Sequence, residues 1–400
     1  MDQLRKLASR TARTASAILL AVLCLAAPRL GGAADPFEID AVLSLSGPGS
    51  FTGHDEAQSL AALEVVVNAS GGIAGRPIKI VLHDDQTNPA VTVQLTNAIL
   101  AKHAAVMFGP GIAGTCGAVQ PLIKDSIVAY CFSPAVHPQL GDYMFSTSTE
   151  STDQFTAIAS YFAGRGLTKL ATITATDATG QDGDRAMDAA VTKVKGLELV
   201  DREHFAPSDL SVAAQISRIK SSGAQAIVAW TTGSPFTTIL HAMADQGYSV
   251  PILTTGGNMS FGQVKQYAGI LPKELLFTAV PALTPDLVTD RATKSAIGTF
   301  GRELAKQGAP VPGFVHQTAW DPGFIVVAAL RKYGVSATAL QIRDYIAGLR
   351  GWVGINGPYD FGAHPQRGLG GEAVVIARWN PTRERWEAVS KGGGSPLPAR

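Results

Sequence analysis

The chain contains the stretch AAVMFGPGIAGTCGAVQPL at residues 104–122, and this stretch decides which kind of α/β fold the sequence can form. Its apolar start, residues 104–108, predicts a buried strand, and the segment after the glycines predicts the beginning of a helix. Gly109, Gly111 and Gly114 lie between the two and spell G-x-G-x-x-G. That pattern marks a dinucleotide phosphate site when it joins a strand to a helix. The first question is therefore whether the protein binds a nucleotide.

The surroundings of the glycines argue against a nucleotide. A dinucleotide fold usually carries Asp or Glu at the end of the next strand, about 20 residues further on. The next strand is expected at 126–132 and has no acid at its tip, because Asp125 precedes it. The P-loop sequence Gly-Lys-Ser/Thr is also missing after the glycines. The sequence therefore predicts no nucleotide cofactor.

The same loop suits a simpler anion. Glycines between a strand and a helix let the backbone approach a ligand, and the first turn of a helix offers unpaired N–H groups to a carboxylate. We therefore predict that the N–H groups near Gly114, Thr115 and Cys116 bind a ligand carboxylate, with the Thr115 hydroxyl beside them. Ligands of open α/β sheets lie beyond the carboxyl ends of the strands. A cleft shared by two lobes is the expected ligand site, and simple turns are the alternative.

Strand and helix patterns alternate along the chain from residue 38 and begin again near Ser151. Strands are expected at 38–45, 77–83, 104–108, 126–132, 168–175, 224–230, 250–255 and 275–280. Helices are expected at 55–69, after the N-cap Asn88, and at 184–194, 210–221, 235–246, 290–307, 317–332 and 337–349. This alternation predicts an α/β protein with two lobes of doubly wound parallel sheet. The stretches GPYDF and EAVVIARWN predict antiparallel strands, and residues 391–400 a loose tail.

Residues 1–34 have the organisation of a signal peptide. A basic start precedes an apolar run at 16–27 that is too short to span a bilayer comfortably. Gly32 and Ala34 are small at the positions that a signal peptidase recognises, which predicts cleavage after Ala34 and export to the periplasm. A membrane anchor is the alternative that the short run disfavours, and Leu23 before Cys24 is too bulky for lipid attachment.

The charge balance and the cysteines narrow the choice of partners. The chain has 33 basic and 32 acidic residues, of which residues 1–34 hold five and one, so the exported part carries a net charge of −3. Such a chain has no basic field for nucleic acid. After removal of Cys24, Cys116 and Cys131 remain in an oxidising compartment. They form a disulfide bond or stay free thiols, since sequence does not give the distance between their Cα atoms.

No catalytic set competes with a binding role. The sequence has neither G-x-S-x-G nor H-E-x-x-H. His83, Asp84 and Asp85 follow one another at the end of an expected strand, where acids more often accept hydrogen bonds from the following loop than hold a metal. The sequence therefore predicts a protein that is not an enzyme and that has no metal site or cofactor.

Three longer stretches carry a resemblance to a known family. LSLSGPGSFTG, GGIAGRPIKIVLHDDQTNP and FGPGIAGTCGAVQP are similar to segments of the branched-chain amino-acid (Leu/Ile/Val) binding proteins of ABC importers, which are type I periplasmic solute-binding proteins. TDATGQDGDRA and AIVAWTTGSP resemble the matching stretches of the second lobe, so the resemblance covers nearly the whole exported chain. GGIAGRPIKIVLHDD followed by Asn88-Pro89 is its most specific part.

The resemblance implies two α/β lobes, joined by three hinge crossovers, that close around one small ligand. The first lobe would comprise residues 35–150 and 281–355, and the second residues 151–280 and 356–390. It also implies a monomer that presents its liganded form to an ABC permease in the inner membrane. The ligand-binding positions that it implies, together with those predicted above, are Phe51, Thr52, Gly114, Thr115, Cys116, Ala135, Val136, His137, Ser151, Thr152, Thr179, Thr232, Gly257 and Asn258.

Departures from the family pattern bear on the ligand. In the family's amino-acid binders an Asp at the start of the second lobe binds the ammonium of the ligand, and the ungapped position here is Ser151. Thr179 replaces the Tyr of D-x-Y-G, and residues 254–258 lack the second acid. Burying an ammonium without a carboxylate is costly. We therefore expect an aromatic or related organic acid as the ligand.

This ligand class implies an aromatic wall, for which Phe51, Trp230 and Phe236 are the candidates. Two alternatives stay open. A shift of two residues in the alignment would bring Asp153 to the ammonium position and restore a branched-chain amino acid as the ligand. The second alternative is a periplasmic sensor, whose liganded form signals to a receptor instead of delivering its solute to a permease.

Overall fold

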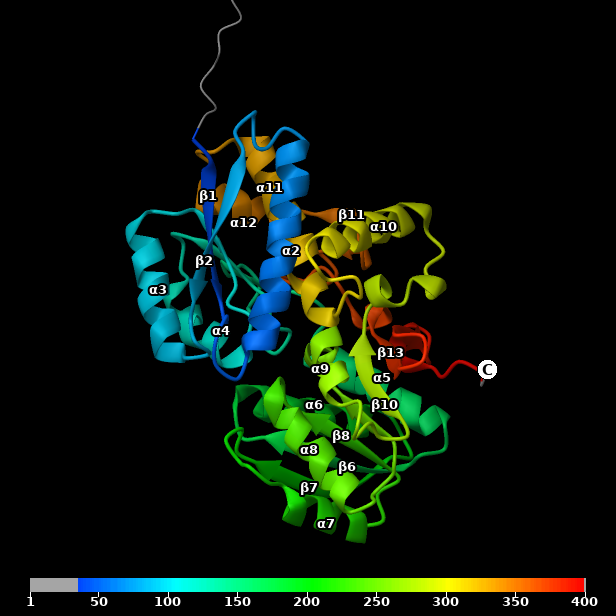
Figure 1. Ribbon diagram of the computed structural model, residues 1–400. Helices are drawn as coiled ribbons and strands as arrows, with labels where there is room; N and C mark the ends of the chain where they lie inside the picture. The colour runs from blue at the N-terminus through cyan, green and yellow to red at the C-terminus, as the bar shows by residue number, and fades with distance from the viewer. Residues whose placement is uncertain (1–34, 399–400) are drawn as a thin grey trace, which may run out of the picture. The chain divides into compact units, whose positions relative to one another are not determined.

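The first sheet is parallel throughout, as the alternating sequence pattern predicts, and two of its strands, β1 and β2, are labelled in Figure 1. The computed structural model describes residues 35–398, so the predicted signal peptide lies outside the described residues. The strands pair in the order β2 (Ile78–Asp84), β1 (Phe37–Leu43), β3 (Val106–Phe108), β4 (Val128–Cys131) and β5 (Met144–Ser146). The sequence did not indicate β5, because three residues are too few to show a periodicity.

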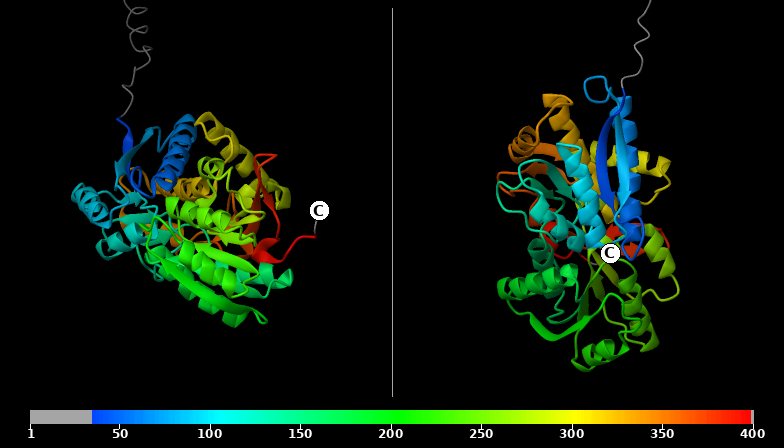
Figure 2. Two further views of the ribbon diagram at one scale, coloured as in Figure 1. Left: turned by 60° about the horizontal axis from the view of Figure 1, so that its bottom comes forward. Right: turned by 90° about the vertical axis from the view of Figure 1, so that its left-hand side faces the viewer.

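Helices cover both faces of this sheet. Alternate residues of β1 divide between two cores: Leu43 packs with α2, α11 and α12, and Val42 packs with α3 and α4 on the opposite face. Figure 2 shows from two further sides that α2 and α11 lie side by side although they are far apart in the sequence. The helices are α2 (Ser50–Ala69), α3 (Pro89–Ala101), α4 (Ala113–Val119), α11 (Phe314–Tyr333) and α12 (Ala339–Ala347).

The second sheet is mixed. Its strand order is β14-β13-β10-β9-β8-β6-β7, with β6 to β10 parallel and β13 and β14 antiparallel to their neighbours. The antiparallel strands predicted near the end of the chain are thereby confirmed. The edge strand β7 escaped prediction because its sequence ELVDREHF is rich in charges, which often protect sheet edges. The strands are β6 (Lys169–Ala175), β7 (Glu198–Phe205), β8 (Ala226–Trp230), β9 (Ile252–Thr254), β10 (Leu275–Ala279), β13 (Val375–Asn380) and β14 (Arg385–Ala388).

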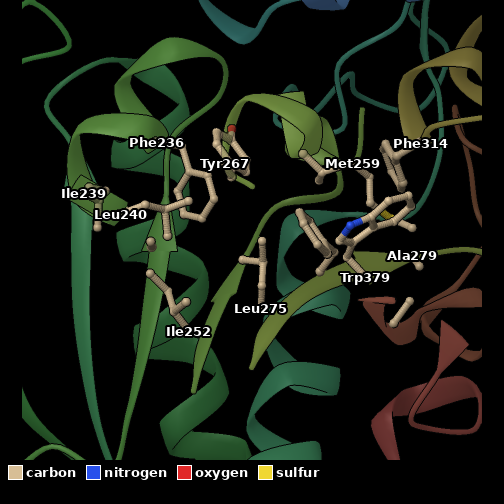
Figure 3. Packing of buried hydrophobic residues seen from close by; sticks show 14 of the residues in the cluster. Phe236, Ile239, Leu240, Ile252, Met259, Tyr267, Leu275, Ala279, Phe314 and Trp379 are labelled. Atoms are coloured by element: carbon tan, nitrogen blue, oxygen red, sulfur yellow. The ribbon is translucent and has the colours of Figure 1, made fainter. Parts of the chain in front are cut away.

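The second sheet is also covered on both faces. α5 (Ser151–Gly164) and α6 (Ala178–Lys193) share one core with it. α7 (Ala213–Ser221), α8 (Ser234–Asp245) and α9 (Phe261–Gln266) contribute to the core on the other face. Figure 3 shows Phe236 of α8 within this second core, beside Tyr267 and Leu240. Phe236 therefore packs in the core, and it is not among the residues that line the pocket described below.

Three segments connect the two layered units, which we call the first lobe (around the five-stranded sheet) and the second lobe (around the seven-stranded sheet). The chain passes from β5 to α5, returns after β10 to α11, and passes again before β13. We expected the last return from residue 356. Instead β12 (Gly357–Asp360) pairs with β11 (Arg350–Gly354), and Tyr359 and Phe361 belong to the core of the first lobe. The last return therefore begins at β13.

The remaining helix, α10 (Arg291–Lys306), packs against α2.

The helices of the ligand side begin earlier than expected. α2 begins at Ser50 rather than residue 55, and α6 at Ala178 rather than residue 184, because their first turns are rich in Gly, Ser and Thr and read as loops. Gly180 makes the early start of α6 sterically possible, since a Cβ there would lie 1.7 Å from the carbonyl oxygen of Ala175. α3 was predicted correctly: Oδ1 of Asn88 accepts a hydrogen bond from the N–H of Ala90.

The end of the chain is held rather than loose over its described part, 391–398. The N–H of Gly393 donates to the carbonyl of Val374, and the N–H of Leu397 donates to that of Val389. Gly394 is buried against Ala157 of α5. The glycines that suggested a flexible tail instead allow it to lie close to a helix.

A disulfide bond joins Cys116 and Cys131, whose Cα atoms are 6.1 Å apart. It connects α4 to the end of β4, 15 residues further on. Replacing both cysteines by alanine is expected to lower the free energy of unfolding by about 3 kcal/mol, because the open chain gains conformational freedom. Urea unfolding of the oxidised protein and the double variant measures this difference. Equal unfolding midpoints for the two proteins, together with two titratable thiols in the unfolded, unreduced wild type, would contradict the disulfide bond.

Candidate functional site

A pocket lies beyond the carboxyl ends of strands from both sheets, the place where open α/β sheets bind ligands. The loops after β3, β4, β8 and β9 contribute to it, together with the first turns of several helices. Its lining residues are Thr52, Glu56, Gly111, Ile112, Ala113, Phe132, Ser133, Pro134, Ala135, Ser151, Thr179, Trp230, Thr232, Thr255, Gly257, Phe314, Val315 and Thr318.

The structure brings some of the predicted ligand residues together in this pocket and places others elsewhere. Those that line it are Thr52, Ala135, Ser151, Thr179, Thr232 and Gly257, together with the aromatic candidate Trp230. Those that do not are Phe51, Gly114, Thr115, Cys116, Val136, His137, Thr152 and Asn258.

The glycine loop differs from its prediction in detail. The N–H of Cys116 donates to the carbonyl of Ile112 at 2.8 Å, so this amide is not available to a ligand. The hydroxyl of Thr115 donates to the same carbonyl at 3.0 Å. α4 begins at Ala113, so Gly114, Thr115 and Cys116 are its second to fourth residues, and of α4 only Ala113 lines the pocket.

Asn258 shapes the pocket from behind. Its side-chain oxygen accepts a hydrogen bond from the N–H of Gly233 at 2.9 Å, and its nitrogen donates to the carbonyl of Thr231 at 2.7 Å. It is completely buried and fixes the loop that carries Thr232, which lines the pocket. Phe51 lies on α2 near Gly262 of the second lobe and is no part of the pocket wall.

Several helices begin at the pocket. Thr52 lies in the first turn of α2, Ser151 is the first residue of α5, and Thr179 is the second residue of α6. Ala113 adds the first residue of the short helix α4. Helix N-termini carry partial positive charge and unpaired N–H groups. The pocket therefore has a positive electrostatic character although no Lys, Arg or His side chain lines it.

Glu56 is the one ionisable side chain among the lining residues. It is completely buried, and neither of its carboxyl oxygens has a hydrogen-bond partner among the described residues. Burial raises the pKa of Glu56 well above its usual range, and the nearby carboxylates of Asp85 and Asp55 raise it further. Gly111, the second glycine of G-x-G-x-x-G, makes room for it, since a Cβ there would lie 2.3 Å from both oxygens.

The acids at the end of β2 support loops. Asp84 accepts hydrogen bonds from the N–H groups of Leu45 and Ser46, and Asp85 accepts one from the Ser44 hydroxyl at 2.7 Å. Within residues 35–398, no group of His, Cys, Asp and Glu side chains is arranged to hold a metal ion.

The comparisons with known proteins now decide the family. The model of the periplasmic binding protein family matches residues 37–385. The chain belongs to this family. No curated protein matches the sequence of this binding protein. The family's members are substrate-binding proteins of ABC transporters rather than enzymes, which supports the expectation of a protein without catalytic activity.

Solved structures show the type I periplasmic binding protein fold. An extracellular ligand-binding receptor from Rhodopseudomonas palustris HaA2 has a TM-score of 0.78 at 20% identity, over 89% of this chain and 99% of that chain. LivJ from Streptococcus pneumoniae in complex with isoleucine has a TM-score of 0.75 at 18% identity, over 89% and 99%. A solute-binding protein from R. palustris in complex with benzoate has a TM-score of 0.75 at 18% identity, over 91% and 98%. None of the described helices is long and apolar enough to span a membrane.

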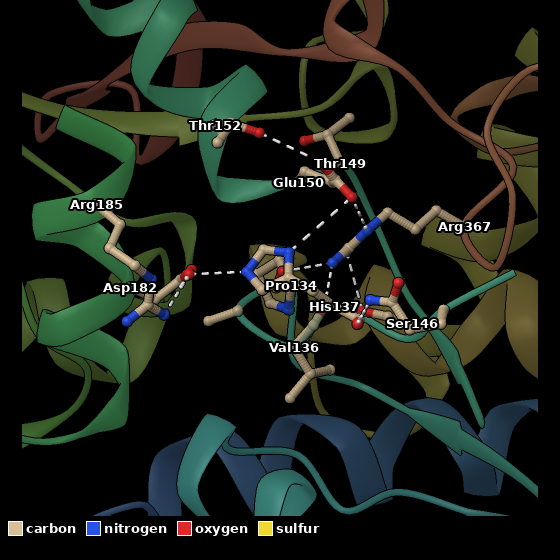
Figure 4. Close-up of polar contacts among 12 residues, drawn as sticks. Pro134, Val136, His137, Ser146, Thr149, Glu150, Thr152, Asp182, Arg185 and Arg367 are labelled. Carbon is tan, nitrogen blue, oxygen red and sulfur yellow. Dashed lines mark hydrogen bonds and ion pairs between the residues drawn. The ribbon is translucent and has the colours of Figure 1, made fainter. Parts of the chain in front are cut away.

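His137 connects the two lobes of this binding protein instead of lining the pocket. Its Nε2 lies 2.7 Å from Oδ1 of Asp182, on α6 of the second lobe (Figure 4). Its Nδ1 faces Glu150 at 4.0 Å, and Glu150 also pairs with Arg367 at 3.3 Å. Arg185 shares Asp182 at 3.1 Å. The loop after β4 is thereby tied to the second lobe by a network of charges.

This network makes a pH-dependent contribution to stability. Hydrogen bonds to Asp182 and Glu150 raise the pKa of His137 to about 9. The folded state therefore binds the proton more tightly than the unfolded chain, whose His has a pKa of about 6.5. The contribution is complete below about pH 6.5 and is lost as the pH rises through about 9.

We expect the melting temperature of the wild type to exceed that of His137→Gln most at about pH 6. The difference should shrink towards about pH 10, because His137 is then neutral in the folded protein too. Thermal unfolding at a series of pH values measures it, and Asp182→Asn should flatten the profile in the same way. A difference that grows with pH would refute the assignment.

Proposed function

We propose that this binding protein captures a small carboxylate-bearing solute in the pocket between its lobes, with aromatic or related organic acids favoured. The main observation in support of this proposal is that the helices α2, α5 and α6 all direct their N-termini into one pocket. Three such ends and the hydroxyls of Thr52, Ser151 and Thr179 offer donors to an anion. Burial raises the pKa of Glu56, the one acid of the pocket, well above its usual range, and this favours the neutral form, which does not repel an anion.

The rest of the pocket suits an apolar ring. Phe132, Trp230 and Phe314 lie in its wall, with Ile112 and Val315 beside them. An apolar wall with a few placed polar groups is the usual composition of a small-molecule site. The solute-binding protein complexed with benzoate shares the fold, which makes an aromatic carboxylate a sensible first probe.

An α-amino acid is the second candidate, and Glu56 is the observation that favours it. The family's acid positions carry no carboxylate here, yet Glu56 of α2 places one carboxyl group in the pocket wall. The predicted alternative, Asp153, gives no such support: it lies against Gly371 and does not line the pocket. The positive helix ends and the raised pKa of Glu56 favour a carboxylate over an ammonium as the bound group.

Family membership supports a role in which the protein delivers its solute to a transporter. Closure of the lobes around the ligand would present a liganded form to an ABC permease in the inner membrane, with the protein acting as a periplasmic monomer. A sensor that passes its liganded state to a receptor is the alternative role. Solute uptake by vesicles that contain the permease, with and without the protein, separates the two roles.

A thermal-shift screen tests the ligand class. The panel contains benzoate, phenylacetate, hexanoate, leucine, isoleucine and valine. A solute at 100 times its dissociation constant stabilises the folded protein by about 2.7 kcal/mol, which gives a clear shift. We expect the aromatic acids to shift the melting temperature and the three amino acids to leave it unchanged. Stabilisation by leucine, isoleucine or valine alone would contradict the proposal.

A further inference from the structure

We propose that Glu56 is a specificity-determining residue that acts as a carboxylic acid, donating its O–H to an oxygen of the bound carboxylate. The inference rests on the proposed function, because it needs an anionic solute in this pocket. No position implied by the family resemblance includes Glu56, and the sequence placed it inside an expected helix. The O–H of Glu56 would be a second hydrogen-bond donor from α2, in addition to the hydroxyl of Thr52 and those of Ser151 and Thr179 in the second lobe.

The geometry supplies the first argument. Glu56 lies on α2 one turn after Thr52, and both residues line the pocket. Its side chain is completely buried, yet neither oxygen meets a donor or acceptor among the described residues. An unpaired buried polar group is costly, and native proteins keep few of them. A solute in the pocket is the partner that would satisfy it.

The close approach of Gly111 supplies the second argument. A Cβ at this position would lie 2.3 Å from both oxygens of Glu56, so any other residue would displace the carboxyl group. Gly111 therefore leaves free the space that the carboxyl group of Glu56 occupies. Gly111 itself lines the pocket, which places the carboxyl group at the wall's inner surface rather than in the core behind it.

The surrounding charges decide the form of the acid. Asp55 and Asp85 lie near Glu56, and both disfavour a further negative charge. Within residues 35–398, Glu56 forms no ion pair with Lys, Arg or His that would stabilise its anion. An anionic solute beside an ionised Glu56 would add repulsion in a site of low dielectric constant. The neutral acid removes that repulsion and provides a donor at the same time.

Two variants separate this role from an ion pair with a ligand ammonium. Glu56→Gln keeps the size and a donor group but can never carry a charge, and Glu56→Leu removes the donor. With benzoate as the probe, calorimetry should give an affinity for Glu56→Gln within about threefold of the wild type. Glu56→Leu should bind about 10- to 100-fold more weakly, the loss expected for a hydrogen bond to a charged group. A loss of the same size in Glu56→Gln would overturn the proposal.

Infrared difference spectra give a test that needs no ligand. The wild type minus Glu56→Gln should show, at neutral pH, the carbonyl band of a protonated carboxylic acid. Glu38→Gln is the control, since Glu38 is half exposed and pairs with Lys79. Its difference spectrum should show the bands of an ionised carboxylate. The same ionised bands for Glu56 would overturn the proposal.

Failure of the proposed function would be visible separately. If leucine binds the wild type and benzoate does not, the ligand class is wrong, and the titrations are repeated with leucine. Loss of leucine binding in Glu56→Gln would then show an ionised Glu56 paired with the ammonium, and this overturns the inference. Leucine binding retained in Glu56→Gln, together with the protonated band, would support the acid form of Glu56 without the proposed solute.

Discussion

Replacing Trp230 by alanine is expected to lower the free energy of unfolding by about 3–5 kcal/mol and to weaken solute binding about 10- to 100-fold. Trp230 ends β8, is 1% exposed and lines the pocket. Its ring packs on Phe155 with centroids 4.4 Å apart, and Gly183 of α6 lies directly against it. The substitution therefore opens a cavity in the second lobe and removes a wall of the pocket. Urea unfolding and calorimetry with the best aromatic acid measure the two effects.

Phe236→Ala is the matched control for that prediction. Phe236 is a completely buried aromatic residue of the same lobe, and it lies outside the pocket. Its loss should cost about 3–5 kcal/mol of stability while leaving the affinity unchanged. Equal losses of affinity in the two variants would show that binding merely follows stability. Unchanged affinity in Trp230→Ala would remove Trp230 from the site.

Replacing Arg367 by methionine is expected to lower the free energy of unfolding by about 3–5 kcal/mol. The buried guanidinium donates to the carbonyls of Pro134 and Val136 and to the Ser146 hydroxyl, and it pairs with Glu150 (Figure 4). Methionine fills much of the volume but leaves these acceptors without a donor. Affinity should fall as well, because Pro134 lies in the pocket wall.

Arg378→Met is the control for this second prediction. Arg378 is half exposed and pairs with Glu387 across the β13–β14 hairpin at 3.0 Å. An exposed pair contributes about 0–1 kcal/mol, so the variant should unfold almost like the wild type. Urea unfolding of both variants gives the comparison. If both variants lower the free energy of unfolding by the same small amount, the contacts of Arg367 do not stabilise the loops after β4 and β5.

The lobes could be predicted because their signals are local. Apolar runs such as that of β8 and caps such as Asn88 show in a few consecutive residues. Helix starts were harder to predict, since the first turns of α2 and α6 have the composition of loops. The last return to the second lobe was predicted at residue 356, which is too early. The pairing of β12 with β11 keeps this segment in the first lobe, and such pairing depends on the folded arrangement rather than on local sequence.

The candidate site was predictable only where one rule applied. Residues that follow the carboxyl ends of strands, such as Ala135 and Thr232, were found because ligands lie at those ends. Glu56 lies inside α2 and Phe314 begins α11, and nothing in the sequence separates these pocket residues from packing residues. The contacts of Arg367 with loops more than 200 residues earlier also depend on the folded arrangement.

Titration calorimetry with one aromatic acid and with leucine, on the same preparation of the protein, tests the central claim most directly. The strongest aromatic acid of the thermal-shift panel should bind with a Kd at or below about the micromolar level. Leucine should bind weakly or not at all, because the one acid that lines the pocket, Glu56, is proposed to act as a neutral carboxylic acid. Tight binding of leucine that is lost on replacing Asp153 would contradict the account, since it would place an ammonium site where the structure shows none.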